Sequence, residues 1–116
     1  MMNLALSFEL LQAVATMSPE GFTVDVNTFE PITKGFAVAV AETQNSFGNA
    51  GAARVVSYAY HHPEVKAFGG WHNSENNEYY YDAVVIVDDL AEAVKLGKDN
   101  EQIAIFDLNT MTEIRL

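Results

Sequence analysis

The chain contains no cysteine. This absence excludes disulfide bonds, cysteine-bound zinc and thiol nucleophiles, and it agrees with a reducing compartment, so we expect a cytoplasmic protein. No apolar segment approaches the roughly 20 residues that span a bilayer. Residues 1–17 have no Lys or Arg ahead of their apolar run and include Glu9, so we interpret them as mature protein rather than as a signal peptide.

Positive charge is also scarce, with 6 Lys and Arg against 16 Asp and Glu and a formal net charge of −10. Such a surface repels phosphate backbones and anionic lipids, so we expect no direct binding to nucleic acid or membranes. The acidic residues are spread along the chain rather than gathered in a tail. A solubilising surface is the simplest explanation. A surface that mimics nucleic acid and inhibits a DNA-binding protein is an alternative.

Linkers and low-complexity segments are absent as well, and 116 residues fit a single domain, 1–116, with one hydrophobic core. Apolar spacing predicts helices near residues 4–16, 52–61 and 90–97, the last capped by Asp88 or Asp89. Alternation and turn residues predict three hairpins, at 22–32, 65–87 and 103–114, and a strand buried on both faces at 36–41. We therefore expect an α+β fold in which three helix-then-hairpin units and the buried strand form a mainly antiparallel sheet of about six or seven strands, with the helices on one face.

Two stretches of the chain echo each other, VDVNTFEPI at 24–32 and FDLNTMTEI at 106–114. Asp25 and Asn27 in the first correspond to Asp107 and Asn109 in the second. Asp at the start of a tight turn accepts a hydrogen bond from an amide two residues on, and Asn tolerates left-handed backbone. We interpret these four as turn residues rather than as a calcium site, because the third ligand, the turn glycine and the distal glutamate of a calcium loop are missing. Whether the echo is duplication or convergence stays open.

The best candidate for a ligand site is the loop between the buried strand and the second helix. Five consecutive polar residues occupy it: Glu42, Thr43, Gln44, Asn45 and Ser46. Loops at such positions carry function because a helix N-terminus offers free amide donors. The alternative is that Asn45 or Ser46 only caps the helix while Phe47 packs into the core.

Neither metal nor cofactor chemistry has a motif here. The adjacent histidines at 61 and 62 point apart on a helix, and the chain has no H-x-x-x-H spacing, so we expect no metal and no cofactor. No G-x-S-x-G elbow frames Ser46, and Glu42 with His72 could act as acid and base only if the fold brings them together. We therefore expect binding rather than catalysis.

An unusually aromatic arm, Tyr79-Tyr80-Tyr81, faces Trp71 and His72 across the second predicted hairpin. Alternate residues of a strand point to opposite faces, so one side of this arm must differ from the other in burial. Cross-strand packing of Trp71 on a tyrosine is one reading. The other is a protein-binding surface at Trp71, His72 and Tyr80, where self-association by strand pairing is also open.

Two longer segments carry a resemblance to other sequences, GFTVDVNTFEPITKGFAVAVAETQNSFG at 21–48 and FGGWHNSENNEYYYDAVVIVDDLAEAVKLGKDNEQIAIFDLNTMTEI at 68–114. Their most distinctive words are ETQNSFG and AIFDLNT. The chain resembles a group of small hypothetical proteins of gut-type bacteria and of their plasmids and phages. The resemblance implies no activity, cofactor or catalytic residue, only service to a mobile element or to its host's response.

Together these observations favour a non-catalytic binding, interaction or regulatory protein, with a protein partner or self-association through the 42–47 loop and the aromatic hairpin. The alternative is a small enzyme or small-molecule-binding domain with its site at residues 42–46.

Overall fold

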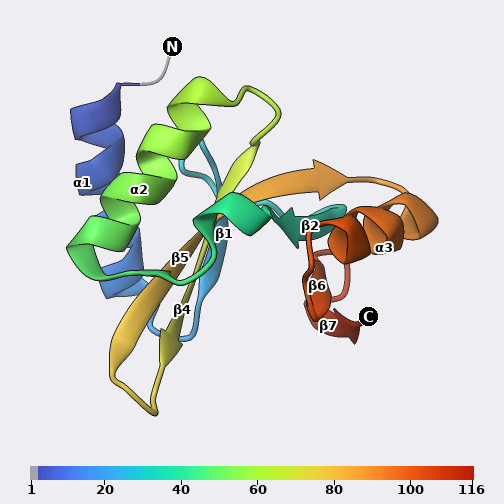
Figure 1. Cartoon of the computed structure of the whole chain (residues 1–116). Helices are drawn as coiled ribbons and strands as arrows, with labels where there is room; N and C mark the ends of the chain where they lie inside the picture. Colours follow the sequence, from blue (N-terminus) through green and yellow to red (C-terminus); the bar gives the residue numbers. More distant parts are fainter. Residues whose placement is uncertain (1–2) are drawn as a thin grey trace.

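Three helices and a seven-stranded antiparallel sheet form the structure, a computed structural model that describes residues 3–116 (Figure 1). The helices are α1 (Leu4–Met17), α2 (Gly48–His61) and α3 (Leu90–Asp99), and a 3₁₀ turn, η1, covers Ala41–Thr43. The strands are β1 (Phe22–Asp25), β2 (Phe36–Ala39), β3 (Ser46–Phe47), β4 (Ala67–Asn73), β5 (Glu78–Val87), β6 (Ala104–Asp107) and β7 (Thr112–Arg115). The expected α+β class, strand number and antiparallel pairing are confirmed.

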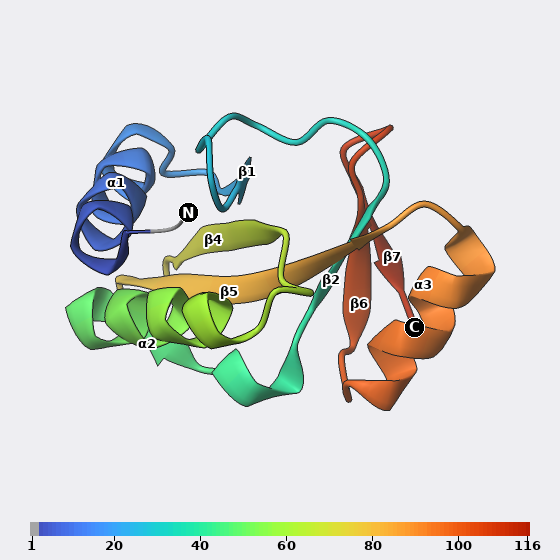
Figure 2. The ribbon, with the colours of Figure 1, turned by 90° about the horizontal axis from the view of Figure 1, so that it is seen from above.

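The sheet is organised around β5, its longest strand. The strand order is β1-β4-β5-β2-β6-β7, and β3 pairs with β5 outside this path. On one side β5 pairs with β4 along most of its length, while on the other side β3 pairs with its first part and β2 with its last part. The segment between β1 and β2 therefore has to cross the sheet, and Figure 2 shows it arching from β1 over to β2.

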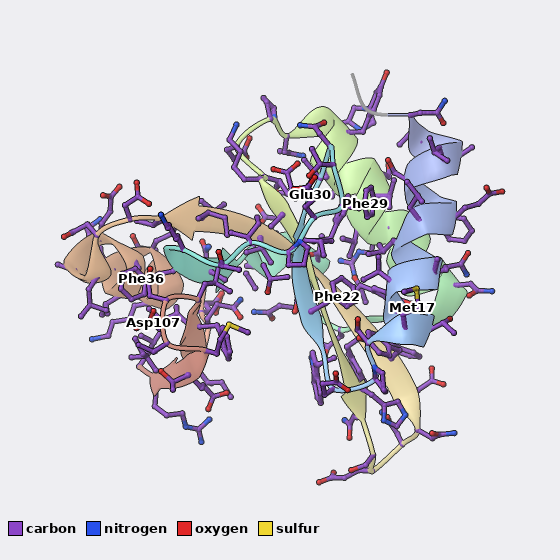
Figure 3. The ribbon with its side chains drawn as sticks, turned by 180° about the vertical axis from the view of Figure 1, so that it is seen from behind. Met17, Phe22, Phe29, Glu30, Phe36 and Asp107 are labelled. Atoms are coloured by element: carbon purple, nitrogen blue, oxygen red, sulfur yellow. The ribbon has the colours of Figure 1, made fainter. Side chains whose placement is uncertain are left out.

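All three helices pack on the same face of this sheet. At one end, α1 and α2 cover Val24, Phe68 and Ala83, which share one face by strand register. At the other end, α3 covers the residues of that face that follow, Val38, Val87 and Ile105. Figure 3 shows the two ends, with Met17, Phe22 and Phe29 near α1 and α2, and Phe36 and Asp107 near α3. The expected placement of the helices on one face is confirmed.

On the opposite face of the sheet, no helix of residues 3–116 packs, and a small cluster covers its middle. There Ala37, Ala67, Val84 and Leu108 form a small core, and Ile32 of the crossing segment packs on it. The outer part of the β4–β5 hairpin, which projects downwards in Figure 1, extends beyond this core.

The three helices differ in how their N-termini are capped. Asn3 Oδ1 accepts a hydrogen bond from the Leu6 amide at 2.9 Å, and Asp89 Oδ2 accepts from the Glu92 amide at 3.0 Å, so of the two expected caps for α3 it is Asp89 that acts. The alternative in which Asn45 or Ser46 caps the second helix is wrong. α2 follows Phe47 without a side-chain cap, because the Ser46 hydroxyl donates instead to the Thr43 carbonyl oxygen at 2.8 Å.

The echoed turns share one hydrogen-bond geometry. Asp25 Oδ1 and Asp107 Oδ1 accept from the amides of Asn27 and Asn109, at 2.7 and 2.9 Å. The turn of the β4–β5 hairpin does the same with a different residue, because Asn73 Oδ1 accepts from the Glu75 amide at 2.9 Å. The interpretation of these residues as structural turns is therefore supported by a third example without the echoed sequence.

Each of the three turns also places its fifth residue in the left-handed region. These residues are Phe29 (φ 59°), Asn77 (φ 58°) and Met111 (φ 58°). Left-handed backbone at this point returns the chain to the partner strand, and a side chain that is not glycine adopts it at some cost. In the first hairpin the return arm forms one bridge, Val24 to Pro31. The hydrogen bonds from the Asp25 amide to the Glu30 carbonyl oxygen and from the Ile32 amide to the Thr23 carbonyl oxygen flank it, so Pro31 takes a position where the ladder needs no amide.

Candidate functional site

Three aromatic rings line up across three adjacent strands on the helix-free face. Register places Trp71 of β4 opposite Tyr80 of β5, and Phe47 of β3 opposite the same tyrosine. The Trp71 and Tyr80 rings stack with centroids 5.1 Å apart and planes at 18°, and the Tyr80 and Phe47 centroids are 5.4 Å apart at 45°. We call these three residues the aromatic ladder.

The ladder exists because the tyrosines of β5 alternate between faces. Tyr79 and Tyr81 point to the helix side, where Tyr81 is buried in the main core and the Tyr79 hydroxyl donates to the Ser18 carbonyl oxygen at 2.7 Å. Desolvation, followed by the neighbouring Tyr81 and Glu20, raises the pKa of Tyr79 to about 12. Tyr80 alone points the other way, as the alternation predicted.

The ladder is open to solvent at both ends. Trp71 and Phe47 are each 46% exposed, although aromatic side chains of this size usually bury most of their surface. The alternative in which Phe47 packs into the core is therefore wrong. The pairing of β3 with β5 sets the orientation of Phe47. Ser46 lies opposite Tyr81 and points inward, so Phe47, the next residue, points outward.

Two carboxylates lie on the same strand face, one on each side of the ladder. Glu78 and Asp82 precede and follow Tyr80 by two residues, so both point to its side of β5. The Glu78 carboxylate lies 3.7 Å from the place that a Cβ on Gly48 would occupy, next to Phe47. Opposite Asp82 stands Gly69, which contributes no side chain to this face.

Asp82 is a partly buried carboxylate with a raised pKa. Burial raises the pKa of its carboxyl group to about 6, with no contribution from a hydrogen bond or a nearby charge among the described residues. In residues 3–116 no buried side-chain oxygen or nitrogen lacks a hydrogen-bond partner, so the Asp82 oxygens keep some contact with solvent. Sequence reasoning missed this residue. Its signal was a single charged residue inside the apolar run YYYDAVVIV.

The polar loop predicted as a ligand site is largely occupied by its own contacts. Thr43 is fully buried, and its hydroxyl accepts a hydrogen bond from the Ala83 amide at 3.1 Å. Ala83 lies in the part of β5 between the residues that pair with β3 and those that pair with β2, so Thr43 supplies the acceptor that no strand supplies there. Ser46 is buried as well. These two hydroxyls hold the loop on the sheet and are turned away from solvent.

Arg54 of α2 closes the same loop from the helix side. Its guanidinium donates to the carbonyl oxygens of Glu42 and Gln44 and lies 3.4 Å from the Ser46 hydroxyl. Gly51 lets the helix come this close, because a Cβ there would stand 2.3 Å from the Ser46 carbonyl carbon. The loop is therefore clamped between β5 and α2.

The remaining predicted residues are spread apart. Gln44 and Asn45 are exposed at the tip of the loop, Asn45 with a left-handed φ of 60°. His72 points to the helix side of the β4–β5 hairpin, where its Nε2 lies 3.0 Å from Asn77 Oδ1. Glu42 lies near Tyr58, whose pKa is raised by desolvation and then by the charges of Glu42 and Glu64. These contacts distribute the expected acid and base over different surfaces.

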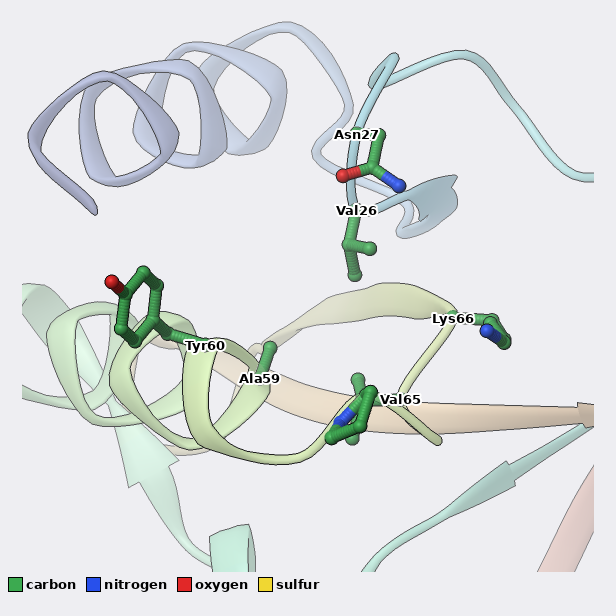
Figure 4. Close-up of a pocket in the computed structure, with 7 residues that line it drawn as sticks. Val26, Asn27, Ala59, Tyr60, Val65 and Lys66 are labelled. Atoms are coloured by element: carbon green, nitrogen blue, oxygen red, sulfur yellow. The ribbon is translucent and has the colours of Figure 1, made fainter. Parts of the chain in front are cut away.

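A pocket of about 510 Å³ opens elsewhere, between the end of α2 and the turn after β1 (Figure 4). Figure 4 shows Val26 on one wall with Ala59 and Val65 facing it, and Tyr60 and Lys66 at its ends. Asn27 and Pro63 complete the lining. The pocket is apolar at its floor, and of the predicted residues only Asn27 reaches it.

Comparison of the chain with protein-family models, with curated proteins and with solved structures finds no match. Within residues 3–116, no helix has the length and apolarity needed to cross a membrane. The same residues hold no group of three or more His, Asp or Glu side chains placed to bind a metal ion.

Proposed function

We propose that this protein is a non-catalytic binding module that engages a protein partner through the aromatic ladder of Phe47, Tyr80 and Trp71. The observation that carries the proposal is the exposure of this stacked set, with Trp71 and Phe47 each 46% open to solvent on a sheet face without a helix. Tyr and Trp dominate the energetics of protein interfaces, because they bury large areas with little loss of conformational freedom. A rigid stack on three paired strands is already ordered before a partner arrives.

The charge of the molecule favours the same class of function. A net charge of −10 keeps the chain soluble and repels nucleic acids, while leaving basic or neutral protein surfaces free to approach. The partner would be a protein of a mobile element or of its host, the setting that the sequence resemblance implies. The clamped Thr43 and Ser46 give less support to a ligand site in the polar loop.

Affinity capture with matched variants tests the proposal. Trp71→Ala removes one end of the ladder, and Tyr60→Ala removes an aromatic residue of similar exposure, 49%, on α2. We expect wild type and Tyr60→Ala to retain a partner from lysate of the source cells, and Trp71→Ala to lose it. Circular dichroism must show that both variants are folded.

Two results would count against the proposal. One is capture of the same partner by Trp71→Ala at wild-type yield. The other is capture of no protein at all by the wild type, with chemical cross-linking used to hold short-lived complexes.

A further inference from the structure

We propose that the aromatic ladder recognises arginine side chains of a basic partner segment, with the carboxylates of Glu78 and Asp82 receiving the guanidinium groups. This inference rests on the proposed function and names the chemistry of the partner. It follows from the residues that surround the ladder rather than from the rings alone.

The electrostatics of this face have one sign. Register places Thr23, Asp25, Gly69, Glu78 and Asp82 on it, and none of the residues that β1, β3, β4 and β5 contribute to this face is basic. Aromatic faces themselves carry partial negative charge and attract cations placed within about 6 Å of the ring centre. Rings and carboxylates together therefore favour a cation.

The spacing suits an arginine. Residues two apart on one face of a strand are separated by about 6.6 Å, so each carboxylate lies one step from the Tyr80 ring. Tyr80 lies between Phe47 and Trp71, so a guanidinium stacks on the exposed face of Trp71, where its N–H edge can reach a carboxylate of β5. An ammonium group lacks this planar fork. Gly69 contributes no side chain opposite Asp82, although Val84 Cγ2 closes part of that space, 3.2 Å from where a Cβ on Gly69 would stand.

Asp82 also behaves like a group that lacks its partner. Its carboxylate is desolvated without an internal cation or hydrogen bond among the described residues, while its oxygens still reach solvent. A carboxylate that is half-buried and unpaired is destabilising, and a bound cation removes that penalty. A carboxylate kept in this state next to exposed stacked rings is typical of a recognition site rather than of a core.

Fluorescence provides a direct test, because Trp71 is the single tryptophan of the chain. The probe is the peptide acetyl-Gly-Arg-Gly-Arg-Gly-amide, and its control is the same peptide with citrulline, which keeps the shape of arginine without its charge. We expect the arginine peptide to change Trp71 emission with saturation. We expect the affinity for the citrulline peptide to be lower by about tenfold or more, since hydrogen bonds to charged groups are the stronger ones.

Substitutions of the two carboxylates test whether they bind the arginine peptide. Asp82→Asn and Glu78→Gln keep the size of each side chain, and the pair combined is expected to weaken the arginine peptide about tenfold or more. Glu75→Gln changes an exposed carboxylate in the turn of the same hairpin and is expected to leave affinity unchanged. Circular dichroism of each variant separates loss of binding from loss of folding.

Three results would overturn the inference: no saturable change in emission with the arginine peptide, equal affinity for the citrulline peptide, or unchanged affinity in the Asp82→Asn/Glu78→Gln variant. The proposed function is judged separately. If a captured partner depends on Trp71 and is indifferent to Asp82 and Glu78, the ladder binds its partner by other chemistry and only the arginine inference fails.

Discussion

Replacement of Asp82 by asparagine should make the protein more stable at neutral pH. The carboxyl pKa is raised from 3.8 to about 6 in the folded state. This difference of about 2 in pKa corresponds to roughly 3 kcal/mol, at about 1.4 kcal/mol for each pKa unit. Because the folded state holds the Asp82 proton more tightly than the unfolded chain, the contribution of Asp82 to stability is most favourable at low pH and falls as the pH rises from about 4 to 6.

Asparagine has almost the same shape and cannot ionise. We therefore expect Asp82→Asn to gain up to about 3 kcal/mol in free energy of unfolding at pH 7, and much less at pH 4, where the aspartate is already largely protonated in the folded state. Urea denaturation of both proteins at several pH values measures this difference. Glu75→Gln, an exposed acidic residue in the β4–β5 turn, is the control and should show neither the gain nor its pH dependence.

The reasoning is refuted if Asp82→Asn is no more stable than wild type at pH 7, or if the gain is the same at pH 4 and pH 7. The first result would mean that the carboxylate is well solvated. The second would mean that the gain comes from packing rather than from charge.

Other substitutions probe the turns, the clamped loop and the β4–β5 hairpin. Asp25→Ala should cost on the order of 1 kcal/mol in unfolding free energy, since its carboxylate accepts two turn amides. Asp107→Ala should lower the free energy of unfolding mainly at pH values above the ordinary aspartate pKa. Desolvation raises the pKa of Asp107, but hydrogen bonds from its own turn lower it overall, so its stabilising effect disappears as the pH falls through the folded pKa. Gly51→Ala should lower the free energy of unfolding by about 1–3 kcal/mol or more, because its Cβ would stand 2.3 Å from backbone. A variant that denatures at the same urea concentration as wild type would show that the loop can move away from the helix. Tyr79→Phe should cost about 1 kcal/mol through loss of the bond to Ser18, and absorbance titration should lose a tyrosine that ionises near pH 12.

Local patterns were sufficient for the order of elements. Periodicity and turn residues predicted the three helix-then-hairpin units, and the position of Asp88 and Asp89 ahead of an apolar helix face predicted a cap at one of them, which is Asp89. The turn roles of Asp25 and Asp107 could be predicted because a side chain that bonds an amide two residues on needs no tertiary context.

Long-range geometry was beyond the sequence. The position of β2 between β5 and β6 depends on pairing across the whole chain, and β3 is two residues long, too short to show any period. The face that Phe47 takes could not be predicted for the same reason, since the pairing of β3 decides it. Nor could the burial of Thr43, because a hydroxyl that completes a strand looks, in sequence, like a hydroxyl that binds a ligand.

Asp82 connects the stability of this fold to its proposed use. A strand that needed only to hold the sheet together would gain from an uncharged residue at this position, because no cation or hydrogen bond among the described residues offsets its desolvation. Proteins commonly keep such costly groups where function requires them, and stabilising changes at those positions then reduce activity. Asp82→Asn should therefore separate the two properties, with higher stability and weaker arginine binding in the same molecule. If Asp82→Asn gains stability and still binds the arginine peptide as tightly as wild type, Asp82 takes no part in binding at the aromatic ladder.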